Sequence, residues 1–180
     1  MKFNLPTWLC AVLALVLVAF GLVFGTWSGY REDRADVTAL LEADNGLMDV
    51  LSYRAADGLN LCVVARRHLG ADDADVLALE QSARALQQST DLNVRRTEDA
   101  KLTVNVADVS ARLNASQSFL ASQRDQKYLE MLTADLNNLK GSTAVTVYNE
   151  AAHAFNQKLG GSLFGTLASM LGVQACPVYQ

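Results

Sequence analysis

The chain has 180 residues, of which 51% are hydrophobic and 19% are charged, and its formal net charge is −4. This length is typical of one domain, or of a small domain with an appendage. Lys2 is the only charged residue before Arg31, so the rest of the chain keeps 14 of the 15 basic and all 19 acidic side chains. Such an acidic surface argues against nucleic acid as a partner, because phosphate binding depends on Lys and Arg.

A wholly uncharged segment runs from Phe3 to Tyr30. Its stretch from Trp8 to Trp27 would form a helix about 30 Å long, which matches the hydrocarbon core of a bilayer. Eleven residues of this stretch are Leu, Val or Phe, and together they favour insertion by about 3 to 7 kcal/mol. Trp8, Trp27 and Tyr30 lie where aromatic side chains prefer the membrane–water interface. The sequence therefore predicts a transmembrane anchor over residues 1–30 that contacts the lipid bilayer through residues 8–27.

A cleaved signal peptide is the competing interpretation, and it requires a shorter apolar core followed by a site with small residues. Residues 24–28, FGTWS, contain no convincing pair of small residues, so retention as an anchor is favoured. Lys2 lies on one side of the segment, and Arg31 and Arg34 lie on the other. The basic residues therefore do not distinguish the two membrane orientations.

A first amphipathic helix is predicted from Asp36 to Leu69, where apolar residues recur at spacings of three, four and seven. They are Val37, Leu41, Met48, Leu51, Ala55, Leu59, Cys62 and Leu69. No proline interrupts the pattern, so we expect this helix to continue from the anchor as one rod. The pattern stops at Gly70, and the acids that follow it are typical of the start of a new helix. We therefore expect a tight helical hairpin at Gly70.

A second helix begins at Val76, and its apolar stripe stops at a polar stretch, residues 88–101, before it resumes from Leu102 to Leu120. The phase of the stripe differs by about two residues across this stretch. Either the helix breaks there, or it carries a polar surface on all sides. We favour a continuous helix with a local irregularity.

A third helix is predicted after the polar run of residues 122–127, with a stripe that begins at Leu129. Gly141–Ser142 interrupts it weakly, and the stripe then continues to the stop signal Gly160–Gly161. The apolar tail over residues 161–180 is too short, and too often broken by glycine, to span a bilayer. It is expected to form a short capping helix or an interfacial segment.

The predicted fold class is all-α, because no stretch alternates with the period of a strand and isoleucine is absent. We expect an N-terminal transmembrane helix followed by an elongated antiparallel bundle of three long helices plus a short C-terminal helix. The predicted segments are an anchor over residues 1–30, a helical bundle over residues 31–160 and a tail over residues 161–180. Apolar residues outside the predicted stripes, such as Val63–Val64, could pair two chains, so a homo-oligomer is a possible state.

The third helix and the tail resemble the LemA family of membrane-anchored bacterial helical proteins. Tyr148-Asn149 is followed seven positions later by Phe155-Asn156 and then by Lys158, which is similar to the family's Tyr-Asn … Tyr/Phe-Asn … Lys pattern. In the first long helix, Arg54-Ala55 with Asn60-Leu61 resembles the family's Arg-Ala-Asp-Leu-Ile-Pro-Asn-Leu segment.

The chain departs from the family pattern at several positions. Leu59 stands where the family has proline, Val145 where it has arginine, and the proline after Lys158 is missing. The resemblance implies an all-α bundle on a single-pass anchor in the bacterial inner (plasma) membrane. It also implies an undefined biochemical role, with no established enzymatic activity and no cofactor.

The paired aromatic–asparagine dipeptides are the most distinctive feature of the sequence. Their spacing of seven places the rings of Tyr148 and Phe155 on one helical face, where they would be core. Asn149 and Asn156 would then flank the packed seam and hydrogen-bond neighbouring helices, which fixes register. Asn60 on the first helix is the predicted partner across the bundle.

No residue pattern predicts a metal site or a catalytic site. His68 and His153 lack a second ligand at the spacing that a helical metal site needs. Scattered acids, including Asp99, are interpreted as helix caps or solvated faces. Cys62 is a predicted core residue, which could pair with Cys176 only outside the cytoplasm and with the tail folded back.

The sequence therefore predicts a non-enzymatic, membrane-tethered helical bundle without a cofactor. It would present a helical surface to an unidentified protein partner or act in membrane-associated assembly. The alternative is a structural protein that acts on membrane shape through its anchor and its apolar tail.

Overall fold

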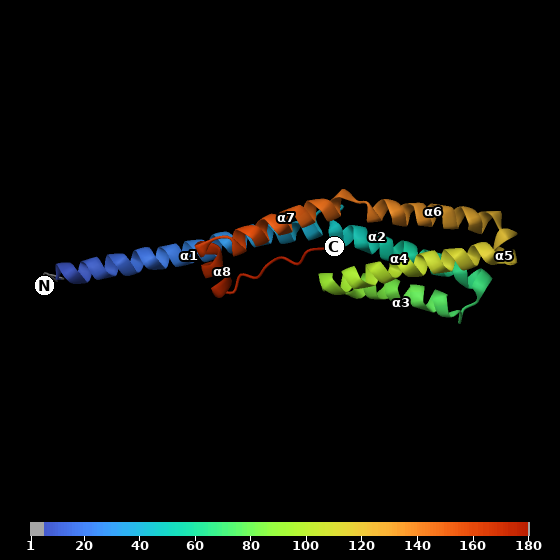
Figure 1. Ribbon diagram of the computed structural model, residues 1–180, viewed down its shortest axis with the longest axis horizontal. Helices are drawn as coiled ribbons and strands as arrows, with labels where there is room; N and C mark the ends of the chain where they lie inside the picture. The colour runs from blue at the N-terminus through green and yellow to red at the C-terminus, as the bar shows by residue number, and fades with distance from the viewer. Residues whose placement is uncertain (1–5, 180) are drawn as a thin grey trace. The chain divides into compact units, whose positions relative to one another are not determined.

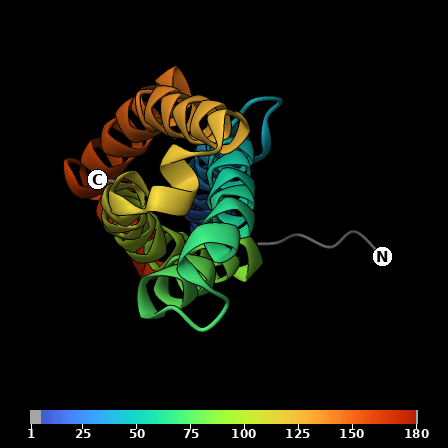
Figure 2. The ribbon, with the colours of Figure 1, turned by 90° about the vertical axis from the view of Figure 1, so that its right-hand side faces the viewer.

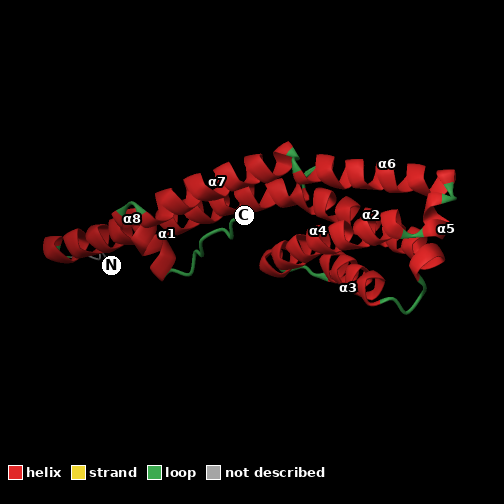
Figure 3. Ribbon diagram, turned by 45° about the vertical axis from the view of Figure 1, so that its right-hand side comes forward, coloured by secondary structure: helices red, strands yellow, loops and turns green. Residues whose placement is uncertain are grey.

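The computed structural model describes residues 6–179, and all regular secondary structure within that range is helical (Figure 3). The helices are α1 (Thr7–Glu42), α2 (Leu47–Leu69), α3 (Ala74–Gln88), α4 (Leu92–Ala115), α5 (Gln117–Leu120), α6 (Gln123–Lys140), α7 (Thr143–Gly160) and α8 (Leu163–Met170) (Figure 1). The predicted all-α class is confirmed. Lys2, which bears on membrane orientation, lies outside the described residues.

The chain separates into two compact units. The first combines the chain up to Ala39 with Glu150–Cys176, and the second combines Leu40–Asn149 with the residues from Pro177 onward. Both units therefore contain an early and a late part of the chain. These boundaries differ from the segments expected from the sequence, because the last two helices and the tail are divided by their contacts.

The first unit contains the candidate transmembrane helix. Within the described residues, one helical stretch, which begins at Thr7, is long and apolar enough to cross a membrane. Its apolar side chains are not covered by other parts of the protein, and Leu17, for example, is 69% exposed. The core helix of a soluble protein would bury such side chains, whereas lipid would cover them in a bilayer.

The predicted continuous rod from the anchor to Leu69 is wrong, because α1 ends at Glu42 and α2 begins at Leu47. Asn45, in the turn between the two helices, adopts a positive φ of 58°, which a continuous right-handed helix does not allow. A Cβ atom at Gly46 would lie 2.6 Å from the carbonyl oxygen of Ala43, so the turn also requires a glycine there. The apolar spacing did not reveal this turn, because the stripe resumes in phase beyond it.

The second predicted helix also breaks, and the favoured continuity across residues 88–101 is wrong. Helix α3 ends at Gln88 and α4 begins at Leu92. The Asp91 carboxylate accepts a hydrogen bond from the Asn93 backbone N–H at 2.8 Å, which caps α4. The Arg95 Nε–H donates to the Ser89 carbonyl oxygen at 2.5 Å, so a buried arginine holds the loop.

The third predicted helix is divided at Gly141–Ser142 into α6 and α7. Its start lies earlier than the stripe suggested, because the Ser122 hydroxyl accepts a hydrogen bond from the Asp125 backbone N–H and caps α6 at Gln123. The predicted short helix of the tail is present as α8. The first and third long helices expected from the sequence are thus interrupted once each, and the second is interrupted twice, before Leu92 and again at Ser116.

In the second unit, α2 packs against α3, α4 and α6, and α3 also packs against α4. Figures 1 and 2 show these helices side by side and end on. Gly58 of α2 allows a close approach, since a Cβ atom there would lie 2.7 Å from Leu102 Cδ1 and 3.2 Å from Ala83 Cβ. The core contains the predicted stripe positions Leu51, Ala55, Cys62 and Leu102. Further core residues of α3 and α4 are Leu79, Leu86, Val109 and Leu113.

Candidate functional site

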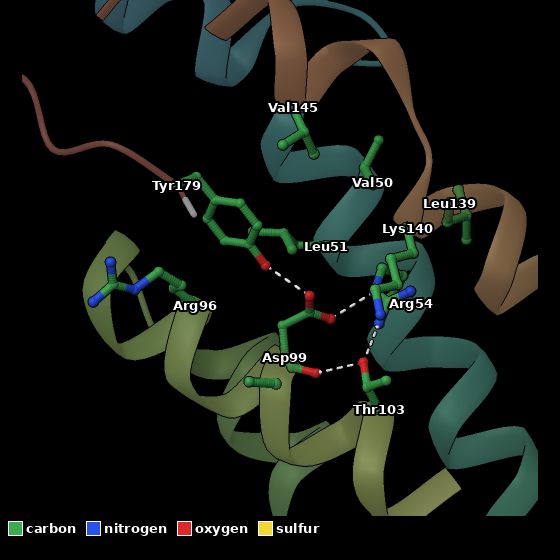
Figure 4. Close-up of a pocket in the computed structure, with 11 residues that line it drawn as sticks. Val50, Leu51, Arg54, Arg96, Asp99, Thr103, Leu139, Lys140, Val145 and Tyr179 are labelled. Atoms are coloured by element: carbon green, nitrogen blue, oxygen red, sulfur yellow. Dashed lines mark hydrogen bonds and ion pairs between the residues drawn. The ribbon is translucent and has the colours of Figure 1, made fainter. Parts of the chain in front are cut away.

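Arg54 lies at the centre of the most connected polar cluster of the second unit. It belongs to α2 and is 2% exposed. Its Nε–H donates to Asp99 Oδ1 at 2.5 Å, and its Nη2–H donates to Thr103 Oγ1 at 2.9 Å (Figure 4). Its Nη1–H donates to the carbonyl oxygen of Leu136. One side chain therefore joins α2 to α4 and α6.

Tyr179, from the C-terminal segment, completes this cluster. Its hydroxyl donates to Asp99 Oδ2 at 2.7 Å, and Figure 4 shows the ring reaching toward α4. Burial and the neighbouring Asp99 carboxylate raise the pKa of Tyr179 far above its usual range. The phenol therefore stays protonated at neutral pH, and it acts as a hydrogen-bond donor to the carboxylate.

A cavity of about 390 Å³ adjoins this cluster. It is lined by Val50, Leu51, Arg54, Arg96, Asp99, Ala100, Thr103, Leu139, Lys140, Val145 and Tyr179. A second cavity, of about 300 Å³, is lined by Arg54, Thr103, Val106, Ala107, Ser110, Thr133, Leu136, Asn137 and Lys140. The two cavities share three lining residues, Arg54, Thr103 and Lys140, and we refer to the pair as the α4–α6 crevice because α4 and α6 contribute to the lining of both.

The side-chain amides of Asn149 and Asn156 hydrogen-bond backbone groups rather than side chains of other helices. In the second unit, Asn149 Nδ2–H donates to the Tyr179 carbonyl oxygen, and Asn149 Oδ1 accepts from the Tyr179 N–H at 2.8 Å. In the first unit, Asn156 makes the same two hydrogen bonds with Cys176, each 2.8 Å long. Each asparagine thus binds both polar groups of one residue in the extended C-terminal segment.

Helical and extended spacings explain why this pattern recurs. Seven residues of a helix rise about 10.5 Å, and three residues of extended chain cover about 10 Å. The rings that precede the asparagines, Tyr148 and Phe155, are buried. The Tyr148 hydroxyl also donates to the Pro177 carbonyl oxygen at 2.6 Å, so three side chains of α7 hold the segment.

The predicted role of Asn60 is wrong. Asn60 is exposed on α2 and hydrogen-bonds the Asp57 side chain, whereas Asn149 and Asn156 bind backbone at Tyr179 and Cys176. Burial, together with the charge of Asp135, raises the pKa of Asp57. The sequence could not reveal these partners, because they lie in a segment without regular secondary structure.

Tyr30 and Lys158 meet in the first unit. The Tyr30 side chain is buried, and its hydroxyl lies 3.0 Å from Ser162 Oγ. Lys158 Nζ lies 2.5 Å from Asp33 Oδ2 and 5.3 Å from the centre of the Tyr30 ring. The hydrogen bond that Lys158 donates to the Asp33 carboxylate raises the pKa of Lys158. The Tyr30 ring is therefore covered by protein, and Tyr30 at the membrane–water interface stays a prediction.

The two tryptophans differ in their surroundings. Trp8 is 67% exposed, as expected for a side chain that faces lipid or solvent. Trp27 is half-buried, and the guanidinium carbon of Arg31 lies 4.6 Å from the centre of one of its rings. Arg31 therefore makes a cation–π contact with the Trp27 ring at the end of the apolar run.

His68 belongs to an ionic cluster at the end of α2. Its Nε2 lies 2.8 Å from Asp125 Oδ2, and Arg67 Nη1 lies 2.8 Å from Asp125 Oδ1. The hydrogen bond from His68 is the main cause that lowers the pKa of Asp125, with further contributions from Ser122 and Arg67. His153 is exposed on α7.

Metal binding and disulfide formation find no support in the part of the chain that the structure describes. No group of three or more His, Cys, Asp or Glu residues there could hold a metal ion. Cys62 and Cys176 are buried free thiols, so the pairing considered from the sequence is not formed. Burial raises the pKa of the Cys62 thiol to about 11, which keeps it protonated and unreactive at neutral pH.

Sequence reasoning missed Asp99 of the Arg54 cluster and Asp125 of the His68 cluster. Asp99 was interpreted as a solvated acid, but it receives hydrogen bonds from Arg54 and Tyr179. No local signal marked it, because its partners lie 45 and 80 residues away in the chain. For Asp125, in contrast, the Ser122-x-x-Asp125 spacing was an available helix-start signal.

The residues that resemble the LemA family lie in α2 and α7, and in both helices they bind other segments of the chain. Arg54 joins α2 to α4 and α6, and Asn149 and Asn156 hold the C-terminal segment. The likeness rests on these sequence motifs alone. Comparison of the chain with protein-family models, with curated proteins and with solved structures gave no match.

Proposed function

We propose that this chain is a membrane-anchored, non-enzymatic helical-bundle protein of the LemA type, which presents a helical surface to a protein partner. The observation that carries the proposal is the α4–α6 crevice in a chain whose α1 exposes an uncharged apolar surface. Such a crevice fits the apolar face of an amphipathic helix, because exposed apolar lining gains free energy when a partner covers it.

The polar cluster supports binding rather than catalysis. Arg54, Asp99 and Tyr179 satisfy one another, and the high pKa of Tyr179 keeps its phenol protonated. A catalytic nucleophile needs a nearby base that is free to take its proton. The hydrogen-bonded side chains of the cluster instead line the crevice, which favours recognition of a partner by shape.

The test is site-specific photo-crosslinking of the full chain in native membranes. A crosslinker at Thr133, which lines the crevice, should trap one partner in a defined product. Val106→Glu places a charge in the crevice and should abolish that product. Val104→Glu is the matched control on the exposed surface of the same helix and should leave the product unchanged.

Two results contradict the proposal. One is a crosslinked product that survives Val106→Glu, provided that circular dichroism shows both variants to be equally helical. The other is extraction of the wild-type chain from membranes by alkaline carbonate, because a spanning helix resists that treatment.

The second candidate function is action on membrane shape, favoured by the exposed apolar side chains of α8. Leu163 is 89% exposed and Met170 is 80% exposed. An amphipathic segment inserted beside an anchor can wedge apart the lipids of one leaflet. Liposome tubulation or size change that depends on these side chains, tested with a Leu163→Ser, Met170→Ser double variant, would favour this candidate over the first.

A further inference from the structure

A third cavity, of about 390 Å³, lies in the first unit at the end of the apolar part of α1. It is lined by Trp27, Arg31 and Arg34 of α1 and by the turn Leu171–Gln174 that follows α8. We propose that this cavity binds the phosphate of an anionic phospholipid headgroup. The inference rests on the membrane anchor of the proposed function, but not on a protein partner.

The two arginines supply the charge that such a ligand needs. Arg34 Nε–H donates to the Gln174 carbonyl oxygen at 3.0 Å, which holds its guanidinium group against the turn and leaves other N–H donors of that group for a ligand. Arg31 is held over the Trp27 ring. A planar guanidinium group matches the oxygen atoms of a phosphate in bidentate geometry.

These positive charges are not neutralised by nearby acids. Within residues 6–179, neither Arg31 nor Arg34 forms an ion pair with a carboxylate, and Asp33, which lies between them in the chain, pairs with Lys158. Two unpaired guanidinium groups that line one cavity favour an anion. Gly172 of the turn adopts a positive φ of 93° and contributes backbone rather than a side chain to the lining.

The cavity lies at the end of the apolar run of α1. This position favours a lipid headgroup, rather than free phosphate, as the source of the anion. Trp27 ends the apolar run that is exposed along α1. Phe164 of α8 lines a further cavity with Gly21, Gly25 and Gly29 of α1. The exposed apolar side chains of α8 thus lie beside the last turns of the span, where lipid would cover them. A lipid that packs along α1 would place its phosphate at the level of Arg31 and Arg34.

The test measures lipid binding to the full chain in detergent micelles by native mass spectrometry. We expect one molecule of phosphatidylglycerol to stay bound where phosphatidylcholine does not. The double variant Arg31→Gln, Arg34→Gln should bind phosphatidylglycerol at least about tenfold more weakly, because two charge-assisted contacts are lost. Inorganic phosphate should not displace the lipid.

The matched control is the double variant Arg124→Gln, Lys127→Gln on α6. It removes the same charge from another exposed surface, where Arg124 also lies over an aromatic ring, that of Tyr128. It should bind phosphatidylglycerol like the wild type. Equal loss in both double variants would show general charge attraction and would overturn the inference.

Two further outcomes overturn it. One is unchanged phosphatidylglycerol binding after Arg31→Gln, Arg34→Gln. The other is displacement of the lipid by inorganic phosphate, which would identify a site for the free anion. Failure of the proposed function appears in other measurements, namely alkaline extraction and crosslinking, so the two results are distinguishable.

Discussion

Buried and half-buried polar side chains stabilise this fold by hydrogen-bonding backbone groups outside their own helices. Arg54 donates to the Leu136 carbonyl oxygen, Arg95 donates to the Ser89 carbonyl oxygen, and Asn149 binds both polar groups of Tyr179. Backbone groups outside helices need such partners, because an unsatisfied buried donor or acceptor costs about 1 to 3 kcal/mol. Substitution of these residues should therefore lower the free energy of unfolding by more than the size of their side chains suggests.

Arg54→Ala should lower the free energy of unfolding by about 3 kcal/mol, because it leaves the Asp99 carboxylate, whose side chain is 14% exposed, without its charged partner. The measurement is urea unfolding of the detergent-solubilised full chain, followed by circular dichroism. Arg96→Ala is the control, since Arg96 lines the same cavity but is exposed, and it should change stability by less than about 0.5 kcal/mol. Equal effects of the two substitutions would contradict the role of Arg54.

Asn149→Leu should release the end of the C-terminal segment, because leucine can neither donate to the Tyr179 carbonyl oxygen nor accept from its N–H. Amide hydrogen exchange at Tyr179 should become about 10- to 100-fold faster, as expected when two hydrogen bonds are lost. Asn138→Leu on the exposed surface of α6 should leave that exchange rate unchanged. Unaltered exchange in Asn149→Leu would show that Asn149 does not hold the C-terminal segment.

Acid stability should depend on Asp125, whose pKa His68, Ser122 and Arg67 hold below the usual value of 3.8. Since the pKa is lower in the folded state, the ionised carboxylate stabilises the fold above about pH 4, and this contribution is lost as pH falls through the folded-state pKa. Asp125→Asn should therefore lose less stability than the wild type between about pH 5 and about pH 2. Thermal unfolding at several pH values measures this, with Asp108→Asn as an exposed control that should follow the wild type.

At the scale of helices, the connections depend on a few residues with special geometry. Asn45 adopts a positive φ in the turn between α1 and α2, the Asp91 cap begins α4, and the Ser122 cap begins α6. Close packing depends in the same way on Gly58, where α2 approaches α3 and α4. Hydrophobic periodicity alone does not show these points, because the stripes continue on either side of them.

Gly58→Val should lower the free energy of unfolding by about 1 to 3 kcal/mol, because the added atoms meet Leu102 and Ala83 in a packed core. Unfolding in urea measures the change. Gly160→Val is the matched control at the end of α7, where a Cβ atom would meet nothing within 4 Å, and it should be far better tolerated. A stabilised Gly58→Val variant would show that the helices can move apart without cost.

At the scale of the whole molecule, each unit combines the late part of the chain with an earlier helix. The candidate span of α1 belongs to the first unit, together with Glu150–Cys176. The Arg54 cluster belongs to the second unit, which receives Tyr179 from the C-terminal end. The C-terminal residues therefore contribute to both units.

Val16→Arg should weaken membrane insertion, because an arginine near the centre of a span costs about 2.5 to 3.5 kcal/mol. This is a large part of the total of about 3 to 7 kcal/mol that favours insertion of the apolar side chains. Alkaline extraction of membranes should release a larger fraction of this variant. Val104→Arg makes the same substitution at an exposed site on α4 and should stay membrane-bound; equal retention of both variants would contradict a spanning α1.

Much of the helical structure was predictable, because each stripe depends on residues three or four positions apart. The buried positions Leu51, Ala55 and Cys62 lie on the predicted face of α2. The partners of Asn149 and Asn156 were not predictable, since the extended segment that they bind has no periodic signal. The covering of Tyr30 by Ser162 was hidden for the same reason.

The amino-acid sequence by itself determined that the chain is helical and that one segment is apolar enough to span a membrane. Both properties depend on composition and short-range spacing, which any segment of chain carries without its neighbours. Only the tertiary structure decided that Asp99 meets Arg54 and Tyr179, and that two arginines and a tryptophan line one cavity at the end of the span. Such sites depend on contacts between residues 45, 80 or 140 positions apart, and these exist only after the helices have packed.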